Sequence, residues 1–242
     1  MKKYLLATIA ALALGSGSAV AADLIPEYKA APVPIFNWSG FYIGADVGAA
    51  WGSNNWYDRF DGTLSTSYWT NGVLAGVHAG WNYQTGPIVL GVEGNLDFTS
   101  TRGSSSVVNL LTNLGGASTA SLSTETNWVS TVVGRAGVTS GQVLYYLVGG
   151  WALQGSEHTA SAFYPGLVGG GSLAQTISDT GSGYVLGFGG EFAVWQNFSA
   201  KLEYNYMDFG EKTLSFPGID TSPVKLDQQI HVVKLGISYL FH

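Results

Sequence analysis

The strongest constraint on the fold is the alternation of the last residues of the chain, 231–241. One set of alternate positions is entirely apolar or aromatic: Val233, Leu235, Ile237, Tyr239 and Phe241. The positions between them are mixed and include Lys234, Gly236 and Ser238. A period of two residues is that of a β-strand, because successive side chains point to opposite faces of a sheet. The sequence therefore ends in a strand with one strongly apolar face.

The N-terminus has the pattern of an export signal. Two lysines and an apolar run, residues 4–14, precede the small residues Ala19 and Ala21. The run is shorter than the roughly 20 apolar residues that a membrane-spanning helix needs. We therefore expect residues 1–21 to be a signal peptide that is cleaved after Ala21. Residues 22–37 contain three prolines among small and polar residues, which predicts an extended periplasmic linker.

The composition of the whole chain separates it from ordinary soluble domains. Hydrophobic residues make up 46% and charged residues only 11%, against roughly 25% charged in typical soluble domains. Because no later segment is a long apolar run, the apolar residues must be spread in a finer pattern, as in a transmembrane barrel. The chain has no cysteine and a net charge of −6, which excludes disulfides and thiolate chemistry and argues against nucleic-acid binding.

Strand-like alternation recurs along residues 38–242, which we expect to form one domain. Eight segments show it: 40–51, 73–84, 88–99, 127–138, 143–153, 183–194, 198–209 and 229–241. The fold class expected is an all-β, eight-stranded antiparallel transmembrane β-barrel.

The connections between these segments alternate in length. Three are short, at residues 85–87, 139–142 and 195–197, and four are long, at residues 52–72, 100–126, 154–182 and 210–228. Outer-membrane barrels have short periplasmic turns and longer extracellular loops. We therefore expect both ends of the barrel domain on the periplasmic side and four loops outside.

The two faces of the predicted strands differ in kind. The polar face holds glycine, asparagine, serine and scattered charges of both signs, which suits a tight interior better than a wetted surface. The apolar face should then contact lipid, with aromatic girdles at its edges. The residues expected in the girdles are Trp38, Phe41, Trp51, Trp81, Tyr83, Phe98, Trp128, Phe192, Phe198, Tyr239 and Phe241.

A set of charges lies on the polar face and forms the main candidate site. Its members are Asp46, Glu93, Asp97, Arg135, Glu191, Lys201, Glu203 and Lys234. An eight-stranded barrel is only wide enough for side chains to fill it, so these groups must pair or retain water. Lys234 and Glu203 come from adjacent strands, which predicts a cross-strand pair. The network is expected to plug the lumen, with a narrow solute or proton path as the alternative.

Three stretches resemble known outer-membrane proteins. Lys234, Gly236, Tyr239 and Phe241 have the spacing of the C-terminal signal read by the outer-membrane assembly machinery, although His242 follows the terminal aromatic residue. The opening WSGFYIG at residues 38–44 and the hairpin at residues 183–210 resemble the small outer-membrane barrels of alphaproteobacteria, which are related to opacity-protein and OmpA-type barrels. This resemblance implies a structural protein of the outer membrane that displays its loops to host or neighbouring cells.

Single histidine and tyrosine residues raise two further functions, hemin binding and lipid modification. Some relatives are reported to bind hemin, for which His158 and Tyr164 in the third loop and Tyr57 and Tyr68 in the first are candidates, but they show no ligand spacing. Some eight-stranded barrels modify lipids, yet neither His78 nor His231 has a serine two residues away on its face.

We therefore expect no enzymatic activity, cofactor or metal. The expected partners are outer-membrane lipid and lipopolysaccharide, the assembly machinery, and a host or cell-surface ligand bound through the loops.

Overall fold

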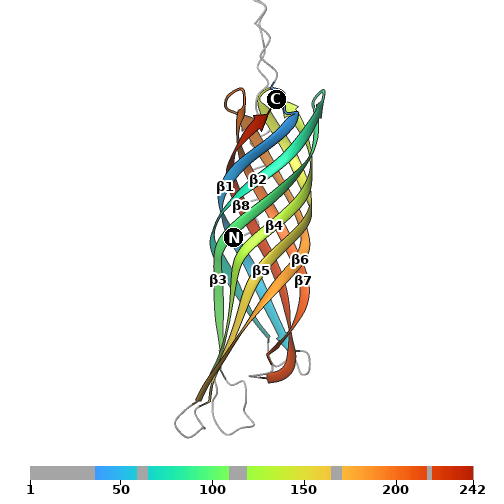
Figure 1. Cartoon of the computed structure of the whole chain (residues 1–242). Helices are drawn as coiled ribbons and strands as arrows, with labels where there is room; N and C mark the ends of the chain where they lie inside the picture. The colour runs from blue at the N-terminus through green and yellow to red at the C-terminus, as the bar shows by residue number, and fades with distance from the viewer. Residues whose placement is uncertain (1–35, 59–64, 109–118, 165–170, 217–219, 242) are drawn as a thin grey trace, which may run out of the picture. The chain divides into compact units, whose positions relative to one another are not determined.

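A computed structural model describes residues 36–58, 65–108, 119–164, 171–216 and 220–241 of the 242-residue chain (Figure 1). The expected signal peptide and most of the expected linker lie outside these residues. Eight strands account for nearly all of the described chain: β1 (Gly40–Asp58), β2 (Ser65–Thr85), β3 (Ile88–Val108), β4 (Thr119–Ser140), β5 (Val143–Tyr164), β6 (Gly171–Ala193), β7 (Phe198–Phe216) and β8 (Asp220–Phe241). No helix among the described residues is long and apolar enough to cross a membrane.

The strands form a closed antiparallel barrel in chain order. The last strand closes it on the first, in a register that pairs Phe41 with Phe241 and Trp51 with His231. Three tight connections, β2 to β3, β4 to β5 and β6 to β7, lie at the same end of the barrel as the C-terminus (Figure 1). The eight-stranded antiparallel barrel and its short turns are therefore confirmed.

The strands are much longer than the hydropathy pattern predicts. Strand β5, for example, continues from the expected end at Leu153 to Tyr164, where it pairs with Gly171 of β6. The segments expected as long loops are thus mostly strand, and that prediction is wrong. Beyond the apolar band most of the buried inward residues are polar, such as Thr124, Ser156 and His158. The hairpins therefore keep their backbone pairing while losing the apolar alternation on which the prediction depended.

The barrel divides at its long-hairpin end. Among the described residues, β2 and β3 pair only as far as Asn71 and Arg102, and β6 and β7 only as far as Tyr184 and Asp208. Beyond these positions the strands continue as two separate leaves, here called the first leaf (β3 to β6) and the second leaf (β7, β8, β1 and β2). Figure 1 shows the two groups of strands diverging at the end opposite the C-terminus. We call the divided part the hairpin section and the closed part the membrane section.

The assignment of faces in the membrane section is confirmed. Outward residues such as Val47, Leu90 and Leu235 are exposed, whereas the charged residues on the alternate positions are buried. One girdle assignment is wrong, because Trp38 is fully buried in the interior apolar cluster. Trp38 precedes the first strand, so strand alternation does not govern its direction.

Candidate functional site

The interior of the barrel is layered. Along β8, starting from the short-turn end, the buried side chains are Leu240, Ser238, Lys234, Val232, Ile230, Gln228 and Leu226. The order apolar, charged, apolar and polar is also found on β1, where it is Tyr42, Asp46, Ala50 and Asn54. Because apolar residues lie on both sides of the charged layer, its ionic groups have to be satisfied by one another and by neighbouring polar side chains.

Glu93 is the centre of one half of the charged layer. Its Oε1 accepts a hydrogen bond from Lys201 Nζ at 2.9 Å, and its Oε2 accepts one from Tyr42 Oη at 2.7 Å. Arg135 lies between Glu93 and Glu191: Nη1 is 3.4 Å from Glu93 Oε2 and Nη2 is 2.6 Å from Glu191 Oε2. These groups come from β1, β3, β4, β6 and β7, so the network crosses the lumen and ties most of its wall together.

Aromatic and hydroxyl groups complete this part of the network. The guanidinium carbon of Arg135 lies 3.9 Å from the ring centroid of Tyr146, a cation–π contact. The Tyr146 hydroxyl donates to Glu203 Oε2 at 2.9 Å, and Ser199 Oγ donates to Glu191 Oε1 at 2.5 Å. The charge pattern alone missed these neutral donors, although strand alternation placed Tyr42 and Ser199 on the polar face.

Lys234 organises the other half of the layer, with acids that the sequence did not pair with it. Its Nζ lies 3.0 Å from Asp97 Oδ2 and 3.8 Å from Asp46 Oδ1. The predicted pair with Glu203 is not formed, although the two residues are direct backbone neighbours. Glu203 instead accepts hydrogen bonds from Tyr146 and Asn205. Asp97 across the lumen and Asp46 on the adjacent strand β1 together attract the ammonium more strongly than a single neighbour whose oxygens are already occupied.

A serine, a histidine and an aspartate also meet in this layer. His78 Nδ1 lies 2.9 Å from Asp46 Oδ2, and its Nε2 lies 2.9 Å from Ser238 Oγ. The spacing of serine and histidine along single strands did not predict this contact, because His78 lies on β2 and Ser238 on β8. His78 and Ser238 are both cross-strand partners of Gly44. A Cβ at Gly44 would lie 2.3 Å from His78 Nε2, so this glycine makes the contact possible.

The histidine and tyrosines considered for hemin do not form a surface site in the described structure. His158 and Tyr68 are buried inside the hairpin section, and both bond to the hydroxyl of Thr124, at 3.1 Å and 2.8 Å. Burial lowers the pKa of His158. The side chains of Tyr57 and Tyr164 lie outside the described part of the structure. No group of three or more potential metal-ligating side chains occurs among the described residues.

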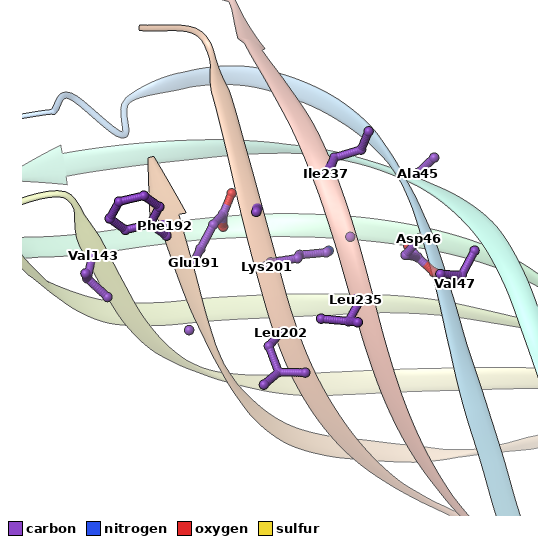
Figure 2. Close-up of a pocket in the computed structure, with 13 residues that line it drawn as sticks. Ala45, Asp46, Val47, Val143, Glu191, Phe192, Lys201, Leu202, Leu235 and Ile237 are labelled. Carbon is purple, nitrogen blue, oxygen red and sulfur yellow. The ribbon is translucent and has the colours of Figure 1, made fainter. Parts of the chain in front are cut away.

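The hollows on the barrel wall face outward. One of about 650 Å³ lies beside the charged layer but is lined by outward apolar residues of several strands, including Val47, Phe192, Leu202, Leu235 and Ile237 (Figure 2). Asp46, Glu191 and Lys201 alternate with these residues on the same strands, and their side chains are buried in the lumen. The hollow therefore belongs to the lipid-facing surface and is not an opening into the lumen.

The four residues of the expected assembly signal have two different environments. Tyr239 and Phe241 are exposed on the outward face, with ring centroids 4.9 Å apart. Lys234 belongs to the charged layer, and Gly236 gives space to Lys201, whose Cε would lie 3.1 Å from a Cβ at this position. Only the two aromatic side chains are therefore accessible in the folded barrel.

The match to a family model agrees with this architecture. The model of the outer membrane protein beta-barrel domain matches residues 8–241. The 31 kDa outer-membrane immunogenic protein of Brucella melitensis biotype 1 is 34% identical over 259 residues, covering 100% of both chains. The 25 kDa outer-membrane immunogenic protein of Brucella abortus is 28% identical and covers 99% of this chain and 98% of its own. Among solved structures, Neisserial surface protein A has 16% identity and a TM-score of 0.39, covering 84% of this chain and 98% of its own.

Proposed function

Since the chain belongs to the outer membrane protein β-barrel family and resides in the outer membrane, we propose that it works as a closed structural barrel and not as a channel. The main observation that supports this proposal is the filled lumen, in which a charged layer is enclosed between two apolar layers. An ion that entered would have to displace the Glu93 and Lys234 networks and then pass Val232 and Ile230, which offer no polar group.

Conductance in planar bilayers tests the closed lumen. The wild-type barrel should give no channel steps above background. A variant in which Val232 and Ile230 are both replaced by serine provides the comparison, because it removes the apolar side chains that β8 contributes to the second apolar layer. Stable conductance steps from the wild-type protein, at a level proportional to the amount inserted, would refute a structural plug.

We propose that the hairpin section faces the outside of the cell, as the alternation of short turns and long hairpins favours. In this position it presents surfaces for contact with host or neighbouring cells. The chain has no cysteine, so single cysteines label cleanly. Ser104→Cys in the hairpin section should react with an impermeant maleimide on intact cells. Ser140→Cys, the same change at an exposed short turn, should not react, and the reverse pattern would invert the orientation.

We infer that the Ser238, His78 and Asp46 arrangement is structural and that the barrel is not an enzyme. All three side chains are buried, with Ser238 only 2% exposed, so a substrate has no approach to the hydroxyl. A fluorophosphonate probe should therefore leave Ser238 unmodified in the folded protein. Modification that disappears in His78→Gln would instead assign a hydrolase.

We also propose that the assembly machinery reads Tyr239 and Phe241, the two signal residues with accessible side chains. Replacing both by alanine should lower the yield of membrane-inserted barrel in cells. Phe98→Ala, which removes a more exposed aromatic residue elsewhere on the lipid face, should leave assembly largely intact. If the double variant inserts with the same yield as the wild-type protein, the proposed assembly signal is wrong.

A further inference from the structure

A row of aromatic rings marks the edge of the apolar band on four neighbouring strands. Tyr184 of β6, Tyr206 of β7, His231 of β8 and Trp51 of β1 are outward ring-bearing residues at the end of the apolar band toward the hairpin section. The next outward residue on each strand is polar, in the order Ser182, Asp208, Gln229 and Ser53. We call these four rings the rim row. It lies where hydrocarbon gives way to the headgroup layer.

The rings of the rim row contact one another continuously. His231 stacks on Trp51 with ring centroids 5.9 Å apart and an interplanar angle of 13°. Tyr206 lies 5.2 Å from His231, and Tyr184 lies 6.3 Å from Tyr206. With strands about 4.8 Å apart, four adjacent strands make a platform roughly 14 Å wide. This width suits two linked sugar rings better than one phosphate group.

Two ring N–H donors of the rim row remain available to a ligand. The hydroxyls of Tyr184 and Tyr206 both donate to Asp208 Oδ2 at 3.2 Å, so they are occupied. His231 Nδ1 lies 2.7 Å from Tyr204 Oη. A phenol that donates to Nδ1 leaves the ring proton on Nε2. Among the described residues, neither His231 Nε2 nor Trp51 Nε1 has a partner.

The opposite edge of the apolar band, on some of the same strands, provides an internal comparison. There the outward rings are Phe41, Phe198, Tyr239 and Phe241, which also contact one another. Three of these four rings carry no polar atom, so this group of rings is suited to anchoring in lipid alone. The rim row differs because it combines stacking surfaces with adjacent donors directed to the headgroup layer.

We propose that the rim row binds the phosphorylated sugar headgroup of an outer-leaflet glycolipid. The rings would stack against the sugar faces, and His231 Nε2–H and Trp51 Nε1–H would donate to phosphate or hydroxyl oxygens. Asp208, on the strand next to His231, already accepts bonds from both tyrosines and from the Gly210 amide. The inference rests on the orientation proposed above, which places this edge in the outer leaflet.

Native mass spectrometry of the detergent-purified barrel tests the site with lipid A, a phosphorylated and acylated glucosamine disaccharide. Wild type should retain lipid A in preference to phosphatidylethanolamine. The double variant His231→Phe and Trp51→Phe keeps the rings but removes both donors. Each lost donor to a charged phosphate oxygen should weaken the binding of lipid A about tenfold. The control pair Trp81→Phe and Tyr83→Phe, stacked at the short-turn edge, should bind as wild type does.

Further measurements distinguish a glycolipid from a free sugar phosphate as the ligand. Dephosphorylated lipid A should bind more weakly than lipid A, and free glucosamine 1-phosphate should not compete at equal concentration. Competition by the free sugar phosphate would replace the glycolipid with a soluble ligand and overturn the proposal. Equal retention of lipid A by wild type and the donor-free variant, with both shown to be folded by heat-modifiable gel mobility, would also overturn it. Because this assay uses detergent, its failure is distinct from a failure of the orientation tested by surface labelling.

Discussion

The membrane section and the hairpin section of this barrel are built from the same eight strands but are stabilised differently. Inside the membrane section, eight charged side chains form two connected networks under apolar layers. Inside the hairpin section, the contacts are between hydroxyl and amide groups, such as Tyr68 with Thr124 and Gln154 with Gln228. Of its ion pairs, Arg102 with Glu125 is exposed and Lys212 with Asp179 is half-buried. The surrounding solvent, more than strand pairing, therefore decides how each section is stabilised.

The positions at which the barrel divides support this conclusion. Pairing between β6 and β7 ends at Tyr184 and Asp208, where the apolar band also ends, and pairing between β2 and β3 ends at Asn71 and Arg102, just beyond Val73. In lipid an unpaired strand edge leaves backbone groups unsatisfied, whereas water satisfies them. The sheet therefore stays closed through the apolar band and is free to split beyond it. Side chains then bridge the leaves, as Lys212 of β7 does to Asp179 of β6.

The largest loss of stability is expected when a buried charge of the membrane section is removed. Glu93→Gln keeps the shape but leaves Lys201, whose ammonium lies 2.9 Å from Glu93, without its acid. An uncompensated buried charge should lower the free energy of unfolding by about 3 to 5 kcal/mol. The measurement is the urea midpoint of the folded barrel in lipid vesicles. Glu157→Gln, the same change at an exposed position of the hairpin section, should change stability by less than about 0.5 kcal/mol.

Removing both charges should be less harmful than the single changes suggest. The double variant Glu93→Gln and Lys201→Met no longer contains the unpaired ammonium, so its loss should fall short of the sum by more than about 0.5 kcal/mol. Arg135 keeps its bond to Glu191 in every variant of this cycle. Losses that add within that margin would mean that the two groups are separately hydrated, and the contrast between the sections would then fail.

Alternation and loop lengths were sufficient to predict the barrel and its buried charged face, but not the pairing of the charges. Val47 and Asp46 could be assigned to opposite faces because adjacent residues of a strand must point in opposite directions. The partner of Lys234 could not be assigned, because Asp97 lies 137 positions away along the chain and is reached across the lumen. Nor could His78 be placed beside Ser238, since that contact requires β1, and specifically Gly44, to bring β2 and β8 together.

An intermediate and local loss of stability is expected when a hydrogen bond between the two leaves is removed. Tyr68 belongs to the second leaf and its hydroxyl lies 2.8 Å from Thr124 of the first leaf. Tyr68→Phe removes this bond and should cost about 1 kcal/mol, which corresponds to about fivefold faster amide exchange if the leaves open without global unfolding. Hydrogen exchange of β2 and β4 in the hairpin section is the measurement. Tyr145→Phe on the lipid face is the matched control. A shift of the global urea midpoint as large as that of Glu93→Gln would show that the two sections unfold as one unit.

The smallest effect is expected from a surface ion pair of the hairpin section. Arg102 and Glu125 are 2.6 Å apart, but their side chains are 70% and 37% exposed. Water screens such a pair, and holding two long side chains in one geometry costs entropy, so exposed pairs contribute about 0.2 to 1 kcal/mol. Arg102→Gln should therefore change local exchange in β3 and β4 by at most about fivefold, and the change should shrink as salt rises from 0.01 M toward 1 M. The effect of Glu93→Gln should persist over the same range, because salt does not enter the filled lumen. Equal salt sensitivity of the two variants would show that the charged layer is wet, and would remove the physical basis for distinguishing the sections.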